Sequence, residues 1–378
     1  MAALLRAFFE MLDAAFQADI FSQSEPQYID CDVTQQGELT SVISKHYAHL
    51  DLKVIDIRQS GGIEINSNNF LVETDKGTYL LKLIQQLAAG TPESDQRDLL
   101  ERQYALIDWL HEREVPSPKP VKASTKKYVC DISPERSASF ARFVQGSYFS
   151  GAQECVQAVG SAVGRMHAVL KETPTELQIT REVPAFSPEA KAVFFAVLEN
   201  KHAEQSVFST EHQTLLTEVT PFLSAIWDAV LGHEQIYSES PRGLQHIDLH
   251  PHNILMKANH VAAFLDFDSL KLGPLKSMLG FSAFKLLRQV VCASGNRLTV
   301  NEKRNLVTDY CNVIFEHLPE LRSDLKSISL FAYAEVCRRI SIIFKLNIVD
   351  NSPVWNHVLA IQIVGLNEIE SLFGPLDS

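Results

Sequence analysis

A single stretch of this sequence restricts the possible folds more than any other, because polar residues, an apolar run and two carboxylates follow one another between positions 246 and 268. It begins with His-Ile-Asp-Leu-His-Pro-His-Asn at residues 246–253 and ends, after the apolar run 261–265, with Asp-Phe-Asp at residues 266–268. The apolar run predicts a β-strand, so Asp266 is expected at the end of a hairpin that starts beside Asn253. A fold with this hairpin brings Asp248, Asn253 and Asp266 to one place.

These three residues have the chemistry that phosphoryl transfer requires. Transfer from a nucleotide needs a carboxylate that receives the proton of the acceptor hydroxyl, and oxygen ligands that hold Mg²⁺ against the triphosphate. We predict Asp248 as the catalytic carboxylate and Asn253 and Asp266 as the magnesium ligands. The spacing Asp-x-x-x-x-Asn is that of the protein kinase catalytic loop, in which one short loop aims both the base and the amide. The alternative interpretation is a polar loop between helices, with Asp248 capping a turn.

The longer string His-x-Asp-Leu-His-Pro-x-Asn-Ile-Leu, followed by Leu-Asp-Phe-Asp, resembles the aminoglycoside phosphotransferase and choline kinase group. These are small-molecule kinases with a protein-kinase-like fold. The resemblance implies an α+β fold of two lobes, with a small antiparallel β-sheet in the N-terminal lobe (N-lobe) and a mostly helical C-terminal lobe (C-lobe). It also implies that ATP and Mg²⁺ are used to phosphorylate a hydroxyl group.

Length and charge agree with this interpretation. A chain of 378 residues is long enough for two lobes with a sizeable core. The net charge of −12 opposes binding to nucleic acid or to an anionic membrane surface, and fits a cationic or neutral acceptor. The six cysteines are scattered without a Cys-x-x-Cys pair, which indicates a reducing, cytoplasmic compartment. Glu10 and Asp13 interrupt the apolar N-terminus, so we expect neither a signal peptide nor a membrane span there.

The chain divides into three predicted parts. Residues 1–36 hold an amphipathic helix at positions 2–17 and a polar connector, and the helix is expected to pack on the body of the protein or on a second subunit of a homodimer. Residues 37–145 form the nucleotide-binding N-lobe, beginning with a short helix at 38–47. Residues 146–378 form the C-lobe, which carries the catalytic loop and the acceptor site.

The N-lobe begins its sheet with three predicted strands, at residues 52–58, 70–73 and 78–84. Gly77 supplies the turn between the last two. The loop between the first two is rich in Gly, Asn and Ser, so its backbone N–H groups can cover nucleotide phosphates, and we assign Gly61, Gly62 and Asn66 to this role. A plain hairpin loop is the alternative. The loop is similar to the corresponding loop of homoserine kinases.

Lys82 lies on the third strand between apolar neighbours, where a lysine either reaches the surface or points into a polar cleft. We favour the cleft, with Lys82 contacting the α- and β-phosphates. The resemblance implies a glutamate on the helix predicted at 93–113 that orients this lysine. The inner stripe of that helix offers Gln103, and the nearest carboxylate is Glu101 on the other side. Either Gln103 orients Lys82 through a neutral hydrogen bond, or Glu101 does so after a shift in register.

Strands at 127–132 and 137–144 complete the N-lobe, and residues 142–146 match the hinge, where the backbone of Val144 is expected to contact the adenine. In the C-lobe, His246 is predicted to hold the backbone of the catalytic loop, His250 to brace that loop, and His167 to pack. Asp268 assists either the metal or a substrate group. Six further C-lobe helices are predicted at residues 187–203, 210–231, 276–294, 301–317, 321–346 and 353–373.

The leading hypothesis is an ATP- and Mg²⁺-dependent phosphotransferase that acts on the hydroxyl of a small metabolite: an amino alcohol, a hydroxy amino acid or a sugar. An aminoglycoside acceptor is one alternative. Others are an atypical protein kinase, against which the lack of an Ala-Pro-Glu segment after Asp266 counts, and a catalytically weak nucleotide-binding regulator. The sequence does not identify the acceptor or decide between ATP and GTP.

Overall fold

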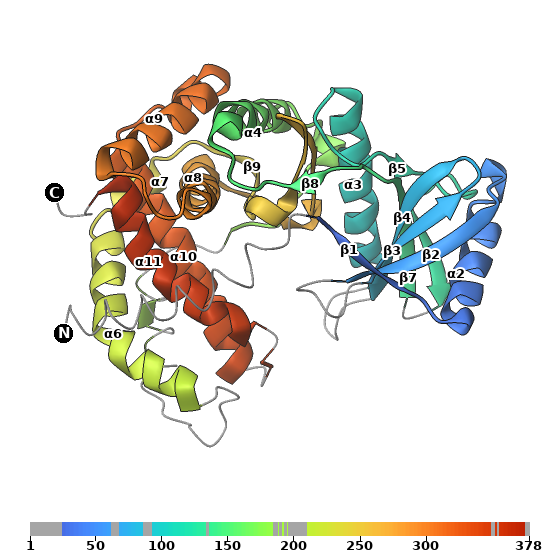
Figure 1. Ribbon diagram of the computed structural model, residues 1–378, viewed down its shortest axis with the longest axis horizontal. Helices are drawn as coiled ribbons and strands as arrows, with labels where there is room; N and C mark the ends of the chain where they lie inside the picture. Colours follow the sequence, from blue (N-terminus) through green and yellow to red (C-terminus); the bar gives the residue numbers. More distant parts are fainter. Residues whose placement is uncertain are drawn as a thin grey trace.

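The structure is a computed structural model that describes residues 25–61, 68–85, 93–133, 136–183, 188, 191–192, 195, 210–348, 352–353 and 355–374. These residues form two lobes, with the strands of the N-lobe on one side and the long helices of the C-lobe on the other (Figure 1). The predicted antiparallel sheet in the first lobe and helical second lobe are therefore confirmed.

An antiparallel sheet in the order β1-β2-β3-β4-β7-β5, with β6 paired to β7, is the basis of the N-lobe. The first three predicted strands correspond to β2 (Val54–Gly61), β3 (Asn69–Thr74) and β4 (Gly77–Gln85). Gly77 has a φ of 115°, the left-handed region that the predicted turn requires. The other strands are β1 (Gln27–Asp30), β5 (Pro120–Val121), β6 (Val129–Ser133) and β7 (Arg136–Arg142).

Strand β4 places Lys82 by simple alternation. Tyr79, Leu81 and Leu83 point to the buried side of the sheet, where the ring of Tyr79 stacks on that of Phe140 at 4.6 Å between centroids. Lys82 therefore points to the opposite face. That face carries its strand neighbour Ser139 of β7, whose hydroxyl donates to Tyr104 of helix α3 (Glu93–Glu112).

The N-lobe starts earlier than the sequence suggested. The segment expected to be a polar connector contains strand β1, which pairs with β2, and the first residues of helix α2 (Val33–His46). Asp32 caps this helix by accepting a hydrogen bond from the Gln35 N–H at 2.8 Å. Strand β1 was missed because three of its four side chains are exposed, so its composition resembles that of a loop.

The hinge connects directly to the catalytic region. Strand β8 (Ser147–Tyr148) follows the hinge and pairs with β10 (Ile254–Lys257), which in turn pairs with β11 (His260–Phe264). The predicted hairpin after Asn253 is therefore confirmed. A second pair, β9 (Arg242–His246) with β12 (Leu270–Pro274), was not predicted.

Long helices build the C-lobe (Figure 1). Four of the predicted C-lobe helices appear with nearly the expected limits, and the fifth, expected at 353–373, is divided into a short turn and helix α11. Most of the helix predicted at 187–203, and all of the one at 2–17, lie outside the described residues. The α-helices are α4 (Val156–Lys171), α6 (Thr210–Leu231), α7 (Glu234–Ser238), α8 (Leu275–Ala293), α9 (Val300–His317), α10 (Leu325–Ile348) and α11 (Leu359–Phe373).

Short 3₁₀ turns occur in both lobes, and two of them belong to the candidate site. Turn η4 (Pro251–Asn253) lies in the catalytic loop and η5 (Phe267–Ser269) follows Asp266. The others are η1 (Ala48–Leu50), η2 (Gln153–Cys155), η3 (Thr175–Leu177), η6 (Pro319–Leu321) and η7 (Asn356–Val358).

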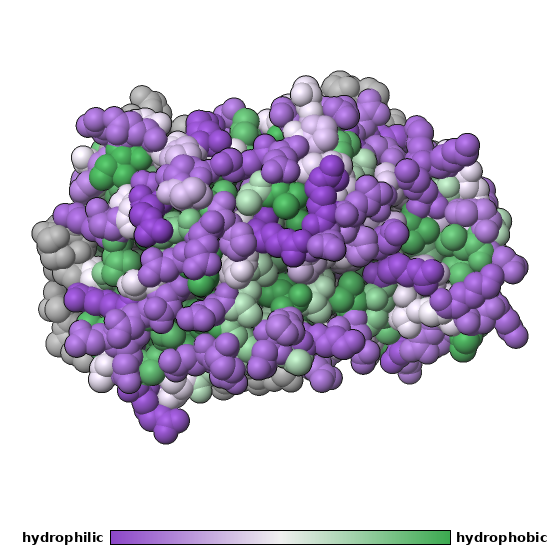
Figure 2. All heavy atoms as spheres, turned by 90° about the horizontal axis from the view of Figure 1, so that it is seen from above, coloured by the Kyte–Doolittle hydropathy of each residue, from purple (hydrophilic) through white to green (hydrophobic). Residues whose placement is uncertain are grey.

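One face of the molecule is mainly polar. Figure 2 shows hydrophilic side chains over most of the face seen from above, with smaller hydrophobic areas between them. In the part of the chain that the structure describes, no helix combines the length and apolar character needed to cross a membrane.

Candidate active site

The catalytic loop is held by a chain of buried histidine contacts. The side chain of His246 bridges two backbone groups, since its Nε2 donates to the Leu265 carbonyl at 2.8 Å and its Nδ1 accepts from the Asp248 N–H at 3.3 Å. Its own N–H donates to Nε2 of His167 at 3.1 Å. His167 completes the chain by donating from Nδ1 to the Val163 carbonyl at 2.8 Å. His246 therefore fixes the loop relative to Asp266, as the sequence predicted.

His167 takes part as a neutral side chain. Burial, together with the nearby His246, lowers the pKa of His167 to about 3, although the hydrogen bond to Val163 opposes this shift. One ring nitrogen donates and the other accepts, which is the pattern of a neutral imidazole. The expectation that His167 packs rather than reacts agrees with this geometry.

Asp248 is an ionised carboxylate held by a cation from helix α10. Its Oδ1 accepts from Nη2 of Arg339 at 3.2 Å, and its Oδ2 lies 3.6 Å from Nε2 of His250. Burial alone would raise the pKa of Asp248, but the neighbouring His250, Arg339 and His246 hold it well below its usual range. Burial lowers the pKa of His250 to about 4, so this histidine is a positive neighbour of Asp248 only below that pH. At neutral pH His250 is uncharged and Arg339 supplies the stabilising charge.

Asn253 and Asp266 present oxygen atoms on the two sides of the hairpin. The amide nitrogen of Asn253 donates to the Asp248 carbonyl at 2.8 Å, which leaves its amide oxygen without a hydrogen bond from any described residue. Asp266 has left-handed backbone angles, with φ 55° and ψ 50°. Such angles are costly for a non-glycine residue and are common at functional sites. Burial and the neighbouring Asp268 raise the pKa of Asp266, while Lys82 opposes this shift.

This donor set fits Mg²⁺. The ion prefers six oxygen ligands and in kinases takes one or two carboxylates, with phosphates and waters supplying the rest. Asn253 and Asp266 would hold it through one amide and one carboxylate oxygen. Among the described residues, no group of three or more His, Cys, Asp or Glu side chains forms a self-sufficient metal site.

Lys82 reaches the C-lobe and meets a partner that the sequence analysis did not assign. Its Nζ donates to Oδ2 of Asp268, and the other oxygen of this carboxylate accepts from Nε2 of Gln103 at 2.7 Å. Burial alone would lower the pKa of Lys82, but Asp268 and Asp266 hold it above its usual range. Gln103 thus contacts Asp268 and affects Lys82 only through this carboxylate.

The prediction that Glu101 orients Lys82 is wrong. The Glu101 carboxylate accepts from the backbone N–H groups of Tyr128 at 3.0 Å and Val129 at 2.8 Å, at the start of β6. Glu101 cannot face Lys82 while Gln103 does, because the two positions differ by about 200° around the axis of helix α3. Glu101 therefore anchors the sheet.

The remaining nucleotide-site residues are placed only in part. Gly61 ends strand β2 opposite Gln27, whereas Gly62 and Asn66 lie outside the described residues. Val144 lies in the hinge, and no hydrogen bond from a described residue engages its backbone N–H or carbonyl. Both groups are thus available to an adenine edge.

The sequence analysis missed the cations beside the catalytic loop. Arg339 donates to the Ile247 carbonyl at 2.6 Å and to Glu335 at 2.9 Å, and its guanidinium lies 3.4 Å from the ring centroid of Phe281. Lys285 of helix α8 lies near the same ring. The available signal was the presence of charged residues inside helices that are otherwise apolar, which is rare unless the charges are paired or functional.

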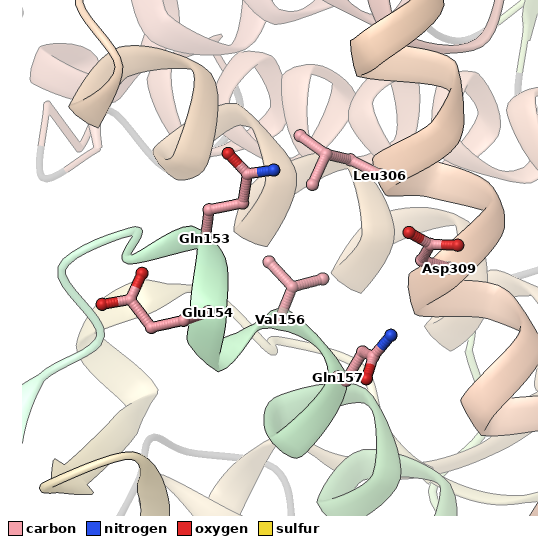
Figure 3. A pocket seen from close by; sticks show the side chains of 6 residues that line it. All are labelled: Gln153, Glu154, Val156, Gln157, Leu306 and Asp309. Atoms are coloured by element: carbon pink, nitrogen blue, oxygen red, sulfur yellow. The ribbon is translucent and has the colours of Figure 1, made fainter.

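A surface pocket lies away from this site. It measures about 520 Å³ and lies between η2 and the start of α4 on one side and α9 on the other (Figure 3). Its lining residues are Gln153, Glu154, Val156, Gln157, Leu306 and Asp309. None of them belongs to the predicted site, so this pocket is not the candidate active site.

Comparison with known proteins places this constellation in a family. Residues 60–276, more than half of the chain, match the sequence profile of the Phosphotransferase enzyme family. Homoserine kinases of Methylobacillus flagellatus and of a Bradyrhizobium species are each 25% identical to the chain, over 209 and 205 residues. Each match covers 54% of this chain and 55% of the relative, so the chain spans about half the length of these relatives.

Solved structures confirm the kinase-like fold. A spectinomycin phosphotransferase in complex with ADP and spectinomycin superposes with a TM-score of 0.60 at 13% identity, covering 89% of this chain and 97% of that one. A choline kinase from Streptococcus pneumoniae gives 0.53 at 13% identity, covering 89% and 98%. Identities this low show the fold alone. With its profile match, its fold and its Asp248–Asn253–Asp266 arrangement, the chain belongs to the Phosphotransferase enzyme family.

Proposed function

We propose that this protein is an ATP- and Mg²⁺-dependent phosphotransferase that transfers the γ-phosphoryl group to a hydroxyl of a small metabolite. One observation carries the proposal: an ionised carboxylate, two oxygen ligands and a lysine from the other lobe converge around the catalytic loop. Asp248 and Asn253 are joined through the loop backbone, and Lys82 is brought to the edge of the same site by Asp268. Family membership supports the same reaction class.

In the proposed reaction the acceptor oxygen attacks the γ-phosphorus of ATP. The bond from that phosphorus to the β–γ bridging oxygen breaks, and ADP leaves with the electron pair. The hydroxyl proton passes to the Asp248 carboxylate and then to solvent. Because the pKa of Asp248 is low, this carboxylate is a weak base. Its main contribution is to orient the hydroxyl, as expected for a reaction in which positioning and charge neutralisation dominate.

The other residues hold the nucleotide. Mg²⁺, when bound, would supply positive charge that neutralises the phosphates. Asn253 and Asp266 would provide its protein ligands, and Lys82, oriented by Asp268, would contact the α- and β-phosphates. The unpaired backbone groups of Val144 would receive the adenine edge. The backbone N–H groups of the loop that contains Gly61, Gly62 and Asn66 would cover the phosphates.

The acceptor class follows from the relatives more than from the fold. The homoserine kinases favour a hydroxy amino acid among the predicted acceptors, which also include amino alcohols and sugars. An aminoglycoside acceptor remains the alternative suggested by the spectinomycin phosphotransferase, but that likeness is one of fold. A protein kinase or a nucleotide-binding regulator is the third option.

The test is ADP release by the purified protein with Mg²⁺ and pools of hydroxy amino acids, amino alcohols, sugars and aminoglycosides. We expect one pool to stimulate turnover in the wild type. Asp248→Asn should reduce that turnover by about 10²- to 10⁴-fold while Mg·ATP still binds. Asp309→Asn, an exposed carboxylate on α9, is the matched control. Unchanged turnover in Asp248→Asn would contradict the catalytic assignment, and ATP binding without turnover in any pool would favour a regulator.

A further inference from the structure

Lys285 is a cation of the C-lobe for which the described residues supply no counterion. It lies on helix α8 and is half-buried, with its Nζ 5.7 Å from the ring centroid of Phe281 and 5.2 Å from that of Phe284. No described residue forms a hydrogen bond or ion pair with this ammonium. Contact with two aromatic rings compensates only part of the hydration that it loses on burial.

The neighbouring carboxylates are already engaged. Glu335 accepts from Arg338 and Arg339, Glu368 from Arg288, and Asp248 from Arg339. Three arginines thus occupy these three carboxylates, and Lys285 is a fourth cation that pairs with none of them. Burial, Arg288 and Arg339 lower the pKa of Lys285 to about 7, against the weaker pull of Glu368 and Asp248. Counted over the described residues, this cluster therefore has one carboxylate fewer than it has cations.

This cation lies beside the proposed reaction centre. The ring of Phe281 is shared by two cations. The Arg339 guanidinium, which donates to Asp248, stacks on this ring, and the Lys285 ammonium lies near the same ring. The charge of Asp248 raises the pKa of Lys285, and the charge of Lys285 lowers the pKa of His250. A molecule of a few carbon atoms whose hydroxyl meets Asp248 would place its other end in this region.

We infer that the acceptor carries a carboxylate that forms an ion pair with Lys285 while its hydroxyl faces Asp248. The inference rests on the proposed function and narrows its acceptor to hydroxy acids, including hydroxy amino acids. A single missing charge matches a carboxylate better than a phosphate ester, which carries nearly two. Cationic amino alcohols and aminoglycosides would be repelled by Lys285 and Arg339. This reverses the preference for a cationic or neutral acceptor that the net charge of the chain suggested.

Matched acceptor pairs test the charge requirement. The pairs are L-homoserine with 3-aminopropan-1-ol, L-serine with ethanolamine, and glycerate with glycerol, each differing by the carboxylate. ADP release and ³¹P NMR of the product are measured with saturating Mg·ATP. We expect kcat/KM to be about 10- to 100-fold higher for the carboxylate member of the pair that the site accepts, as charge-assisted hydrogen bonds allow.

Variants then assign the effect to Lys285. Lys285→Met keeps most of the side-chain volume and should raise the KM of the carboxylate acceptor about 10- to 100-fold with the KM of Mg·ATP unchanged. Lys285→Arg should restore most of the affinity, which a merely structural role would not predict. Lys276→Met is the matched control: it removes a lysine of the same helix, two and a half turns away on the opposite face, whose Nζ contacts only the Ser327 hydroxyl among described residues, at 3.5 Å.

The outcomes separate the inference from the proposed function. Turnover of neutral or cationic members at the rate of their carboxylate partners would overturn the inference and leave the kinase activity standing. Mg·ATP binding without phosphorylation of any carboxylate acceptor would also overturn it. Failure to bind Mg·ATP would overturn the proposed function, and the inference with it.

Discussion

At the scale of single residues, the most informative contact is the one between Lys82 and Asp268. The resemblance implied that the partner of this lysine would lie on the helix predicted at 93–113. In the structure that helix contributes the neutral Gln103, and the charge is on Asp268, two residues after the proposed metal ligand Asp266. The orienting carboxylate thus belongs to the C-lobe.

Variants that move the orienting carboxylate from position 268 to position 103 of helix α3 test this arrangement. Asp268→Asn should raise the KM of Mg·ATP, because Lys82 loses its counterion. The pair is partly exposed, so unfolding free energy should change by less than about 1 kcal/mol. Adding Gln103→Glu to Asp268→Asn should recover part of the Mg·ATP affinity. An unchanged KM in the single variant would show that Asp268 does not orient Lys82.

Lys285 predicts a pH dependence of acceptor binding. The protonated amine binds a carboxylate, which raises the pKa of Lys285 above about 7, so binding takes up a proton. The KM of a carboxylate acceptor should therefore rise as pH increases above 7, by up to about 10-fold per pH unit. The charges that face Lys285 are Arg288 on its own helix, Arg339 on α10, Glu368 on α11 and Asp248 in the loop.

The control for this profile is Lys285→Arg, because arginine keeps its charge at all working pH values. Its KM should stay level between pH 6 and 9. His250, with a pKa near 4, is neutral over that range and contributes no slope. Parallel profiles of the two proteins would refute the assignment to Lys285.

At the scale of elements, helices α8 and α10 determine how far apart the site cations lie. Helix α8 carries Lys285 and helix α10 carries Arg339. The helices approach closely at Gly280, where an added Cβ would lie 2.6 Å from the Ala332 nitrogen and 2.8 Å from the Ile328 carbonyl oxygen. Both contacts are backbone atoms, so a side chain there would push the helices apart.

Gly280→Ala should therefore lower the free energy of unfolding by about 1–3 kcal/mol and reduce the affinity for a carboxylate acceptor. Gly37→Ala is the matched control, since its added Cβ on helix α2 would meet nothing within 4 Å. That variant should gain about 0.5–1 kcal/mol from the higher helix propensity of alanine. Both values are measured by urea denaturation, and a stable Gly280→Ala would contradict the close approach.

Elements also show how far the sequence could be interpreted. Strands β2 to β4 and helices α3, α6, α8, α9 and α10 were predicted because each has its own local periodicity. The β9–β12 pair was not, since it forms between segments separated by a whole hairpin. The chemistry of Asp248, Asn253, Asp266 and Lys82 could be predicted from local sequence patterns. The positions of Gln103, Asp268, Arg339 and Lys285 depend on how helices cross and lobes meet, which no local pattern encodes.

At the scale of the whole molecule, nucleotide and metal should join the lobes and stabilise both. A ligand that binds the folded state at 100 times its Kd adds about 2.7 kcal/mol, so Mg·ATP should raise the Tm of the wild type. Asp266→Ala should lose the part of this increase that depends on Mg²⁺. ATP with EDTA gives the metal-free reference for each protein. An equal Mg²⁺-dependent increase in the variant would contradict the ligand assignment.

The hinge has a mechanical consequence. On one side, the Phe143 N–H is bonded to Thr78 of the sheet, at 3.1 Å. On the other, Gly146 lies so close to the Met256 carbonyl that an added Cβ would be 2.8 Å from it, and Phe149 is bonded to Ile254. Only Val144 and Gln145 lie between these anchor points without a backbone hydrogen bond to the described residues. Rotation of one lobe against the other would therefore pivot at these two residues. An adenine base bound there would lie near the rotation axis and move least, whereas the end of the sheet farthest from the hinge would move most.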